Sequence, residues 1–512
     1  MQTLVECWVS RASAKQRRGR AGRVRPGISY HMYSTHTHDN ELKDYQLPEM
    51  LRVGLEDLVL QVLLLDLGEP SVFLTKAVNP PSALAIKNSL KLLEGLGAVD
   101  CEWGDIDTSS GAVEPTACEA LQVGSNLTAL GFHLATLPVD PRVGKMMIYG
   151  ALFGCIDPAL TIAAAMSARS PFQTPFAKRE EADAARKQFA TEGSDHLTTL
   201  TAFNQWREMR QKNASGMYRW LRESFLSGMT LNQMEDLRKQ FADLLKDIGF
   251  LPQSFRYGPG RKGRYNSSAR SNNDSADSIT QIEANANSSN LQLVKAILCA
   301  GLYPNIIVAP RTLVGPPGKG NKKAGDSAFF SRKGDVHLHP STISFTETSL
   351  DSRYCCYHSI VKTSKIYVRD CTTVSEFALL LFGGHLTVQH VRDVVTIDGW
   401  LNFRISKKPA TLVKHLRSQM ETLLLNKIVS PNIDVTGSPE GKALIQAIST
   451  LVQKETKEVP DKSGTDLCNG ADHSQYGDSG RRDMNRDGMR ERDMDRGGGY
   501  GKEIDRDERR ER

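Results

Sequence analysis

Apolar residues recur with two different spacings in this chain, and a stretch with almost no large aliphatic residue separates the two. Residues 256–290 read RYGPGRKGRYNSSARSNNDSADSITQIEANANSSN, a composition typical of a disordered linker or insertion. Before this stretch, apolar residues recur every three or four positions, which is the spacing of helices. After it, short runs alternate β-branched with polar residues, which is the spacing of strands. The sequence therefore predicts a helical part followed by a β-rich part.

The beginning of the helical part has the outline of a winged helix. Residues 47–66 predict one helix from their apolar periodicity. Residues 82–97 predict a second helix, with Ser82 as its N-cap and Gly97 at its end. A short strand-like stretch follows, so we expect two helices and a small strand pair within residues 47–126.

The next segment, residues 127–252, predicts a bundle of tightly packed helices, because it is rich in small and apolar residues. Thr230 and Gln233 have the spacing of a capping box at the start of its last helix. This helix carries an apolar stripe for which core packing is the expected role. The stripe consists of Leu231, Met234, Leu237, Phe241, Leu244, Leu245 and Ile248.

The β-rich part predicts a small all-β barrel within residues 291–430. Short strand-like runs recur there, namely NIIVA, DVHLHPSTISF, CYHSIVKTS, KIYVRD and VVTID. A helix over residues 409–431 closes the folded part. Beyond it, residues 478–512 hold eleven Lys or Arg and eleven Asp or Glu with almost no aliphatic residue. Such a tail is expected to be disordered and roughly neutral.

Composition limits the classes of protein that this chain can belong to. No window approaches eighteen uninterrupted apolar residues, and the N-terminus lacks an apolar signal core, so we expect no membrane partner and no secretion. Nine cysteines without a Cys-x-x-Cys pair favour a reducing, intracellular compartment, cytoplasmic or nuclear. The net charge of +6 permits a nucleic-acid partner without requiring one.

A basic, glycine-punctuated motif, QRRGRAGR, occupies residues 16–23. Gln16, Arg20 and Arg23 are spaced i, i+4 and i+7, so on a helix they would share one face. A guanidinium group binds phosphate oxygens through two donors at once, and a glutamine can orient a water molecule. The three side chains could therefore act on a γ-phosphate. A basic localisation signal or a loose phosphate-binding patch is the alternative interpretation.

The exact string resembles motif VI of superfamily 2 helicases, in the form used by the DEAH/RHA (DExH-box) family of ATP-dependent RNA helicases. Four downstream segments also resemble that family in the right order. They are LPEMLRVGLEDLVLQVLLLDLG, FLTKAVNPPSALAIKNSLKLLEGLGAVD, LTALGFHLATLPVDPRVGKMMIYGALFGC and, split in two, VHLHPSTISF with SIVKTSKIYVRDCTTVSEFALLLFGG. The resemblance covers roughly residues 3–430 and identifies the chain as a member of that family.

The resemblance implies a multidomain α+β fold. Its parts would be a remnant of the second RecA-like motor domain (1–46), a winged helix (47–126), a helical-bundle or ratchet domain called HA2 (127–252), a disordered linker (253–290), an OB-fold β-barrel with a flanking helix (291–430), and a C-terminal helix with a disordered Arg/Asp/Gly-rich tail (431–512). It also implies that Gln16, Arg20 and Arg23 contact the γ-phosphate of ATP and are catalytic. Arg17 and Arg18 are expected to support the helix or to face solvent.

The other half of such a nucleotide site is not found in the sequence. The string GPPGKGNKK at Gly315 has its glycines too close together, and Gly320 stands where Ser or Thr should follow the lysine. No DExH box occurs, so the Mg²⁺ that accompanies ATP would find its ligands elsewhere. We therefore expect a C-terminal fragment or truncated product that is inactive by itself. The alternative is a catalytically inactive RNA- or protein-binding module, or one that docks a G-patch-type activator through residues 50–125.

Contacts to RNA are expected on the β-barrel. The string KTSK, with Lys362, Thr363, Ser364 and Lys365, offers ammonium, hydroxyl and backbone donors that hold a phosphate backbone without reading its sequence. Ordinary exposed lysines at a strand end are the alternative. His337 and His339 alternate onto one strand face, but two further metal ligands are missing, so no metal site is expected. We expect the histidines of HMYSTHTHDN, residues 31–40, to lie in a surface loop.

Overall fold

The computed structural model describes residues 2–3, 8–103, 123–212, 216–255, 282–314, 323–332, 334–363, 365–389, 393–429 and 438–454. The expected disordered tail beyond residue 455 and most of the expected linker (256–281) lie outside the described residues. Among those described, no helix is long and apolar enough to span a bilayer.

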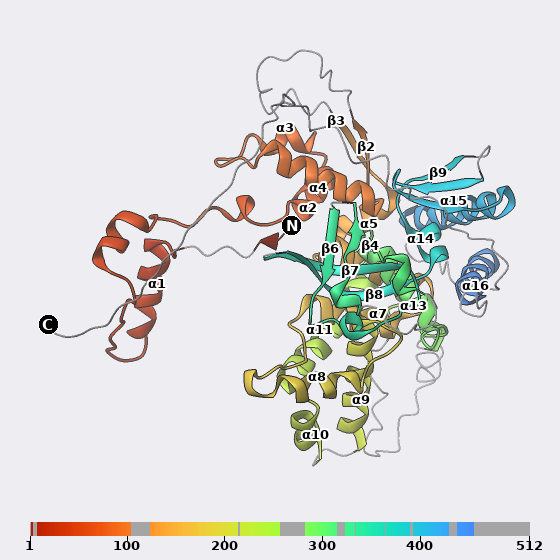
Figure 1. The fold of residues 1–512 in the computed structure, drawn as a ribbon. Helices are drawn as coiled ribbons and strands as arrows, with labels where there is room; N and C mark the ends of the chain where they lie inside the picture. The colour runs from red at the N-terminus through yellow and green to blue at the C-terminus, as the bar shows by residue number, and fades with distance from the viewer. Residues whose placement is uncertain are drawn as a thin grey trace, which may run out of the picture. The chain divides into compact units, whose positions relative to one another are not determined.

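Three α-helices and a strand pair form the described first part of the helical half (Figure 1), so the structure adds a short helix, α3, to the two helices predicted. The Ser82 side chain accepts a hydrogen bond from the backbone N–H of Ala85, and Gly97 ends the same helix, α4, with φ of 73°, so both end signals are confirmed. The helix predicted over residues 47–66 is shorter than expected, because the chain breaks at Gly54. The elements are η2 (Glu49–Leu51), α2 (Glu56–Leu64), α3 (Pro70–Leu74), α4 (Ala83–Leu96), β2 (Val99–Trp103) and β3 (Val123–Leu127).

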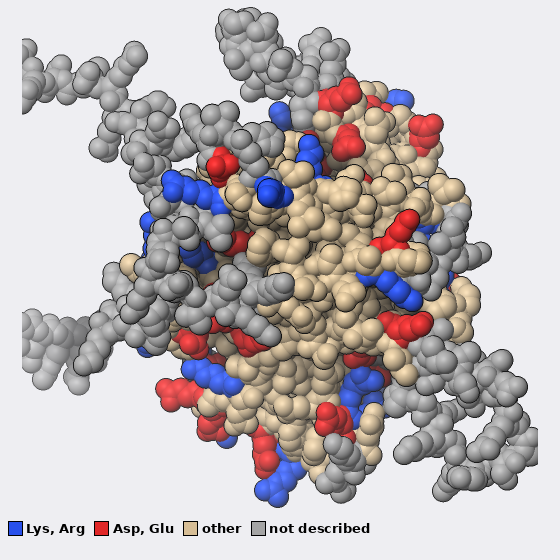
Figure 2. Space-filling model, turned by 90° about the vertical axis from the view of Figure 1, so that its right-hand side faces the viewer, with Lys and Arg blue, Asp and Glu red and all other residues tan. Residues whose placement is uncertain are grey.

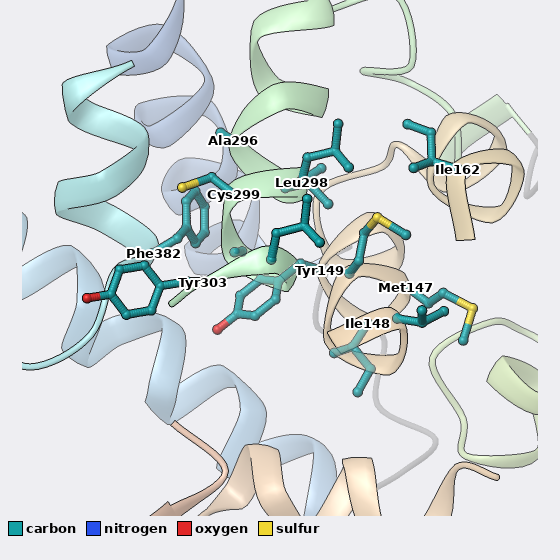
Figure 3. Packing of buried hydrophobic residues seen from close by; sticks show 14 of the residues in the cluster. Met147, Ile148, Tyr149, Ile162, Ala296, Leu298, Cys299, Tyr303 and Phe382 are labelled. Atoms are coloured by element: carbon teal, nitrogen blue, oxygen red, sulfur yellow. The ribbon is translucent and has the colours of Figure 1, made fainter. Parts of the chain in front are cut away.

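The expected helical bundle follows. A Cβ atom at Gly150 would lie 2.3 Å from the Cβ of Ala159, so small residues set the distance between its helices. Figure 3 shows that Tyr149 lies on the side of its helix nearest a later helix that carries Leu298, whereas Met147 lies on the opposite side. The elements are α5 (Ala129–Thr136), α6 (Pro141–Leu152), α7 (Ile156–Ser167), η3 (Phe176–Lys178), α8 (Arg179–Lys187), α9 (Asp195–Lys212), α10 (Met217–Glu223), α11 (Gly228–Asp247) and the later helix α13 (Leu291–Leu302).

The apolar stripe of α11 is packed into the core as expected, but its capping box is not present. Ser227 is the N-cap, and its side chain accepts a hydrogen bond from the backbone N–H of Thr230. The prediction that Thr230 and Gln233 form the cap is therefore wrong by one turn. Ser227 lies three residues before Thr230, and serine is as good an N-cap as threonine.

The predicted linker also extends too far at its C-terminal end. Residues 282–290 are placed against the start of α7, where the first backbone N–H groups of a helix have no partner within it. Ala284 O accepts from the N–H of Ile156, and Asn285 Oδ1 accepts from the N–H of Asp157 at 2.8 Å. The polar composition of this segment reflects a capping role rather than disorder.

Five strands close into the barrel predicted from the sequence. Their order is β7–β4–β5–β6–β8, and β8 pairs with β7 to complete the ring. The β6–β8 pair is parallel, and the other pairs in the ring are antiparallel. The short strand β1 (Gln2–Thr3) pairs with the end of β7. The remaining elements are β4 (Ile306–Val308), η4 (Arg311–Leu313), η5 (Ala324–Asp326), β5 (Phe329–Ser331), β6 (Gly334–Leu338), η6 (Ile343–Thr346), β7 (Tyr354–Lys362) and β8 (Ile366–Val374).

The last strand-like run expected in the barrel, VVTID, lies outside it. The ring is closed by β4 to β8 without it, and residues 394–397 pair in a separate three-stranded sheet of order β11–β10–β9. The helix predicted over residues 409–431 is confirmed. The elements are α14 (Glu376–Phe382), β9 (Leu386–Gln389), β10 (Val394–Ile397), β11 (Leu401–Arg404), α15 (Lys407–Val429) and α16 (Pro439–Lys454).

A buried carboxylate joins the bundle to the barrel. Asp195, at the start of α9, accepts hydrogen bonds from the backbone N–H groups of Ile343 and Cys371, each at 2.9 Å, and pairs with Arg186 at 3.0 Å. Burial raises the pKa of Asp195 to about 6, while Arg186 acts in the opposite direction. Beside it, the Thr372 hydroxyl bonds Ser194 Oγ at 2.7 Å. Strand β8 is therefore fixed to α9.

A buried lysine joins the bundle to the preceding helices. Lys145 Nζ on α6 donates to Leu96 O, the last residue of α4, at 2.7 Å. Burial, followed by the charge of Arg417, lowers the pKa of Lys145 to about 7. The ammonium therefore satisfies a helix C-terminus whose carbonyls have no partner within the helix.

Replacing Asp195 by alanine should lower the free energy of unfolding by about 3–5 kcal/mol, because two backbone donors and a guanidinium lose their acceptor in a buried site. Chemical denaturation followed by circular dichroism measures the change. The matched control is Asp183→Ala, which removes an exposed carboxylate 4.0 Å from Arg179. The control should change stability by less than about 0.5 kcal/mol. Equal losses in both variants would contradict the role given to Asp195.

Replacing Lys145 by methionine should flatten the pH dependence of stability. The folded-state pKa of about 7 lies below the ordinary value of 10.5, so the unfolded chain binds more protons between these values. The lysine's contribution to stability therefore rises with pH across that window and is lost as pH falls toward 7. Melting temperatures at pH 7, 8 and 9 should rise more steeply for the wild type than for Lys145→Met. Exposed Lys178→Met is the control and should follow the wild type.

Candidate functional site

The residues of the basic motif lie on and just beyond helix α1 (Arg11–Ala21). Gln16 and Arg20 are on this helix one turn apart, but the helix ends at Ala21 and Arg23 follows its C-cap, Gly22. The expectation that all three share one helical face is therefore wrong for Arg23. Two glycines close to the end lower the helix propensity there, which explains the early termination.

All three motif side chains are exposed. A Cβ atom built at Gly19 or Gly22 would meet nothing within 4 Å, so the surface beside them is open. Arg17 and Arg18 are also exposed, as expected. The motif therefore presents an open cationic surface on which a phosphate group could be bound from outside the segment.

The base of α1 is held by the following segment. Arg11 Nε donates to His38 O and its Nη1 binds Asp44 Oδ1, both at 2.9 Å, while Ser10 caps the helix. The segment predicted as a surface loop is largely exposed, but residues Thr37–Glu41 form a short π-helical turn, η1. These contacts orient α1 and leave the side that carries Gln16 and Arg20 accessible.

The KTSK string forms the turn between β7 and β8. Lys362, Thr363 and Lys365 are exposed, and the backbone N–H of Thr363 donates to Lys365 O at 2.9 Å, which tightens the turn. Ser364 lies outside the described residues. Two ammonium groups thus stand at the tip of one hairpin of the barrel.

The outer face of β8 continues from this turn. Ile366 and Val368 pack into the barrel interior, so Lys365, Tyr367 and Arg369 alternate onto its outside. We call these three residues the β8 stripe. Sequence reasoning did not select Tyr367 or Arg369, although the alternation in KIYVRD was the available signal.

Two histidines of the HLHPS string stand beside the β8 stripe. His337 is paired in register with Tyr367, and their ring centroids are 6.2 Å apart. His339 Nε2 accepts a hydrogen bond from Arg369 Nη2 at 2.8 Å, which requires a neutral imidazole, and its Nδ1 lies 2.7 Å from Ser341 Oγ and 3.1 Å from the Ser341 backbone N. Burial, then Arg369, lowers the pKa of His339, which favours this neutral form. Within the described residues no cluster of three metal-ligating side chains occurs.

Cysteine chemistry does not supply a further site in the barrel. Cys355, Cys356 and Cys371 are buried as free thiols. Burial raises the pKa of Cys355 to about 12, so its reactive thiolate is suppressed. Cys101 is half-buried and packs against the core, whereas Cys118 lies outside the described residues.

Charge is not concentrated on the face shown in Figure 2. Lysine, arginine and acidic side chains are scattered there around a largely uncharged centre. On this face, binding of a polyanion would therefore depend on local charged groups rather than on a broad basic surface.

Three family models match successive parts of the chain. The helicase-associated domain (HA2), ratchet-like, matches residues 140–199, and the oligonucleotide/oligosaccharide-binding (OB) fold matches residues 294–386. The C-terminal domain in RNA helicases matches residues 393–454, which include β10 and β11 of the separate sheet together with α15 and α16.

Similar proteins are helicases by name. The DExH-box ATP-dependent RNA helicase DExH1 of Arabidopsis thaliana is 37% identical over 88% of this chain and 39% of its own length. The ATP-dependent DNA/RNA helicase DHX36 of Mus musculus is 38% identical over 90% of this chain and 41% of its own length. The putative ATP-dependent RNA helicase DHX57 of Mus musculus is 37% identical over 88% of this chain and 32% of its own length.

The chain thus spans between 32% and 41% of the length of these relatives. The HA2 match lies within the bundle, the OB-fold match includes the barrel strands, and the C-terminal match includes β10, β11, α15 and α16. The chain belongs to the DExH-box family of ATP-dependent RNA helicases and carries the HA2, OB-fold and C-terminal domains of that family.

Proposed function

We propose that this chain is the RNA-holding portion of an ATP-dependent RNA helicase, in which ATP hydrolysis is coupled to movement along RNA. The observation that carries the proposal is the exposed β7–β8 hairpin, with Lys362 and Lys365, on an OB-fold barrel that Asp195 fixes to the HA2 bundle. A rigid support lets such a hairpin keep hold of a phosphate backbone while other domains move. Lys362, Thr363, Ser364 and Lys365 would make backbone contacts.

The two N-terminal segments are proposed to be a winged helix and a motor-domain remnant. Helices α2, α3 and α4, followed by the antiparallel pair β2–β3, support the winged helix at residues 47–126. For residues 1–46 the support is the motif itself and its exposure on α1. A G-patch-type activator is proposed to dock on residues 50–125, and an intracellular location stays a prediction from cysteine usage.

In the intact enzyme, Gln16, Arg20 and Arg23 are proposed to act on the γ-phosphate of ATP. Their exposure supports this, because a group that contacts a nucleotide held by another domain must be open on its own. Arg20 would act from the helix and Arg23 from the turn after it, and both would neutralise charge on the transferred phosphoryl group. Gln16 would orient the attacking water. Mg²⁺ would accompany the ATP, with ligands outside this chain.

The second candidate function is an RNA- or protein-binding module without catalytic activity. One feature of the sequence favours this module: the sequence of this chain contains neither a GxxxxGK[ST] motif nor a DExH box. RNA binding is common to both proposals, and ATP hydrolysis separates them.

The full chain should bind single-stranded RNA with an affinity that falls as salt rises. The double variant Lys362→Ala/Lys365→Ala should reduce the slope of log K against log salt by about 1.4, since each phosphate contact of a single strand contributes about 0.7. Fluorescence anisotropy at several salt concentrations measures the slope. The matched control is Lys178→Ala/Lys239→Ala, which removes two exposed bundle lysines and should leave the slope unchanged. An unchanged slope in the hairpin variant would rule out these lysines as phosphate contacts.

The purified chain alone should show no RNA-stimulated ATP hydrolysis, because arginine fingers need a nucleotide held by a P-loop. Phosphate release with and without RNA measures this. The control is Arg20→Ala, which should give the same background as the wild type. Hydrolysis that rises with RNA and disappears in Arg20→Ala would show that the chain holds a complete nucleotide site, and would overturn the expectation of inactivity.

A further inference from the structure

We propose that the β8 stripe, with the facing His337 and His339, is a stacking site for the bases of single-stranded RNA. This inference rests on the proposed RNA-binding function and adds the way in which the strand is held. The hairpin lysines would bind phosphates, and Tyr367 would carry an unpaired base on its ring.

The first support is the grouping of rings on one outer face of the barrel. The ring of Tyr367 is half-buried and lies 6.2 Å from that of His337, tilted by 46°, and 6.1 Å from that of His339, nearly perpendicular at 87°. Tyr367 does not belong to either hydrophobic core cluster. Base–aromatic stacking contributes about 1–3 kcal/mol per base and tolerates any base, because every base has a π face.

The second support is the order of charges along the strand. Lys362 and Lys365 are at the hairpin end, and Arg369 is two residues beyond Tyr367. The exposed Asp370 follows Arg369 and ends the basic run. Phosphates are therefore favoured beside the hairpin, and this places the adjoining base over Tyr367.

The third support is the rigidity of the strand that carries the ring. The backbone N–H of Cys371 donates to Asp195, and the Thr372 hydroxyl bonds both Ser194 Oγ and His196 Nδ1, at 2.7 and 2.8 Å. A ring on a fixed strand loses little conformational entropy when it binds a base. The ring of Tyr367 is therefore held in place before RNA arrives.

Other uses of these side chains fit less well. A metal site would need three ligands that converge, and no such cluster occurs among the described residues. His339 is already engaged by Arg369 and Ser341. A double helix would present its phosphates but not its base faces, so the aromatic groups favour an unpaired strand.

The test compares two probes on the full chain. One is a fluorescein-labelled adenosine-rich RNA of about ten nucleotides that contains 2-aminopurine. The other is an abasic sugar-phosphate strand of the same length and charge. Tyr367→Ala should weaken RNA binding about tenfold or more and leave abasic binding unchanged. Lys365→Ala should weaken the binding of both probes alike.

Two further variants test the role of the rings, and the conservative Tyr367→Phe guards against misfolding. Tyr367→Phe keeps the ring and should retain wild-type affinity, while His337→Ala removes the neighbouring ring and should weaken RNA binding by a smaller factor than Tyr367→Ala. Wild type and Tyr367→Phe should quench the 2-aminopurine fluorescence, and Tyr367→Ala should not. Thermal melts establish that each variant is folded.

The outcomes separate this inference from the function on which it rests. If Tyr367→Ala binds RNA and quenches 2-aminopurine like the wild type while the lysine variants lose affinity, stacking is refuted and backbone binding stands. If Tyr367→Ala weakens both probes equally, the ring supports the hairpin and stacks no base, so the inference is again refuted. If the wild type binds neither probe, both the inference and the proposed RNA-holding function are wrong.

Discussion

The hydrogen-bonded carboxylate of Asp195 is the interaction on which the relation between bundle and barrel depends. One side chain at the N-terminus of α9 accepts from the backbone of two separate barrel segments, near Ile343 and at Cys371. Burying a carboxylate is costly, and its raised pKa reflects that cost. Two backbone donors and Arg186 offset it. Because the donors belong to the backbone, the contact fixes the position of β8 itself rather than that of a side chain.

Local signals in the sequence predicted those elements whose ends are set by their own residues. Ser82 and Gly97 bound α4 as expected, because a side-chain cap and a left-handed glycine act within one turn. The alternation of β-branched and polar residues predicted the barrel strands, because it too is a property of each strand's own residues. Arg23 was misplaced because periodicity gives a face only while the helix lasts, and the glycines around it end α1 first.

Predictions failed where distant partners decide the structure. The polar residues after Gln281 resemble a linker, yet Asn285 caps α7, more than a hundred residues earlier. The run at residues 394–397 has strand character, but sequence cannot tell that the barrel is already closed when the chain reaches it. The stripe residues Tyr367 and Arg369 were missed for a related reason. Alternation places them on one face of β8, but only the neighbouring strands show that this face points out of the barrel.

One irregularity in β8 allows the strand to serve both partners. Regular alternation would separate interior residues by two positions, yet Val368 and Cys371, both interior, are three apart. Between them Asp370 has a positive φ of 54°, a backbone conformation that few residues other than glycine adopt. This local change lets the first half of β8 turn Tyr367 and Arg369 outward, while the second half turns Thr372 toward the bundle. Residues held in such conformations cluster at functional sites because the surrounding structure must hold them there. The anchoring of β8 by Asp195 and the outward display of its stripe are therefore two consequences of the same strand geometry.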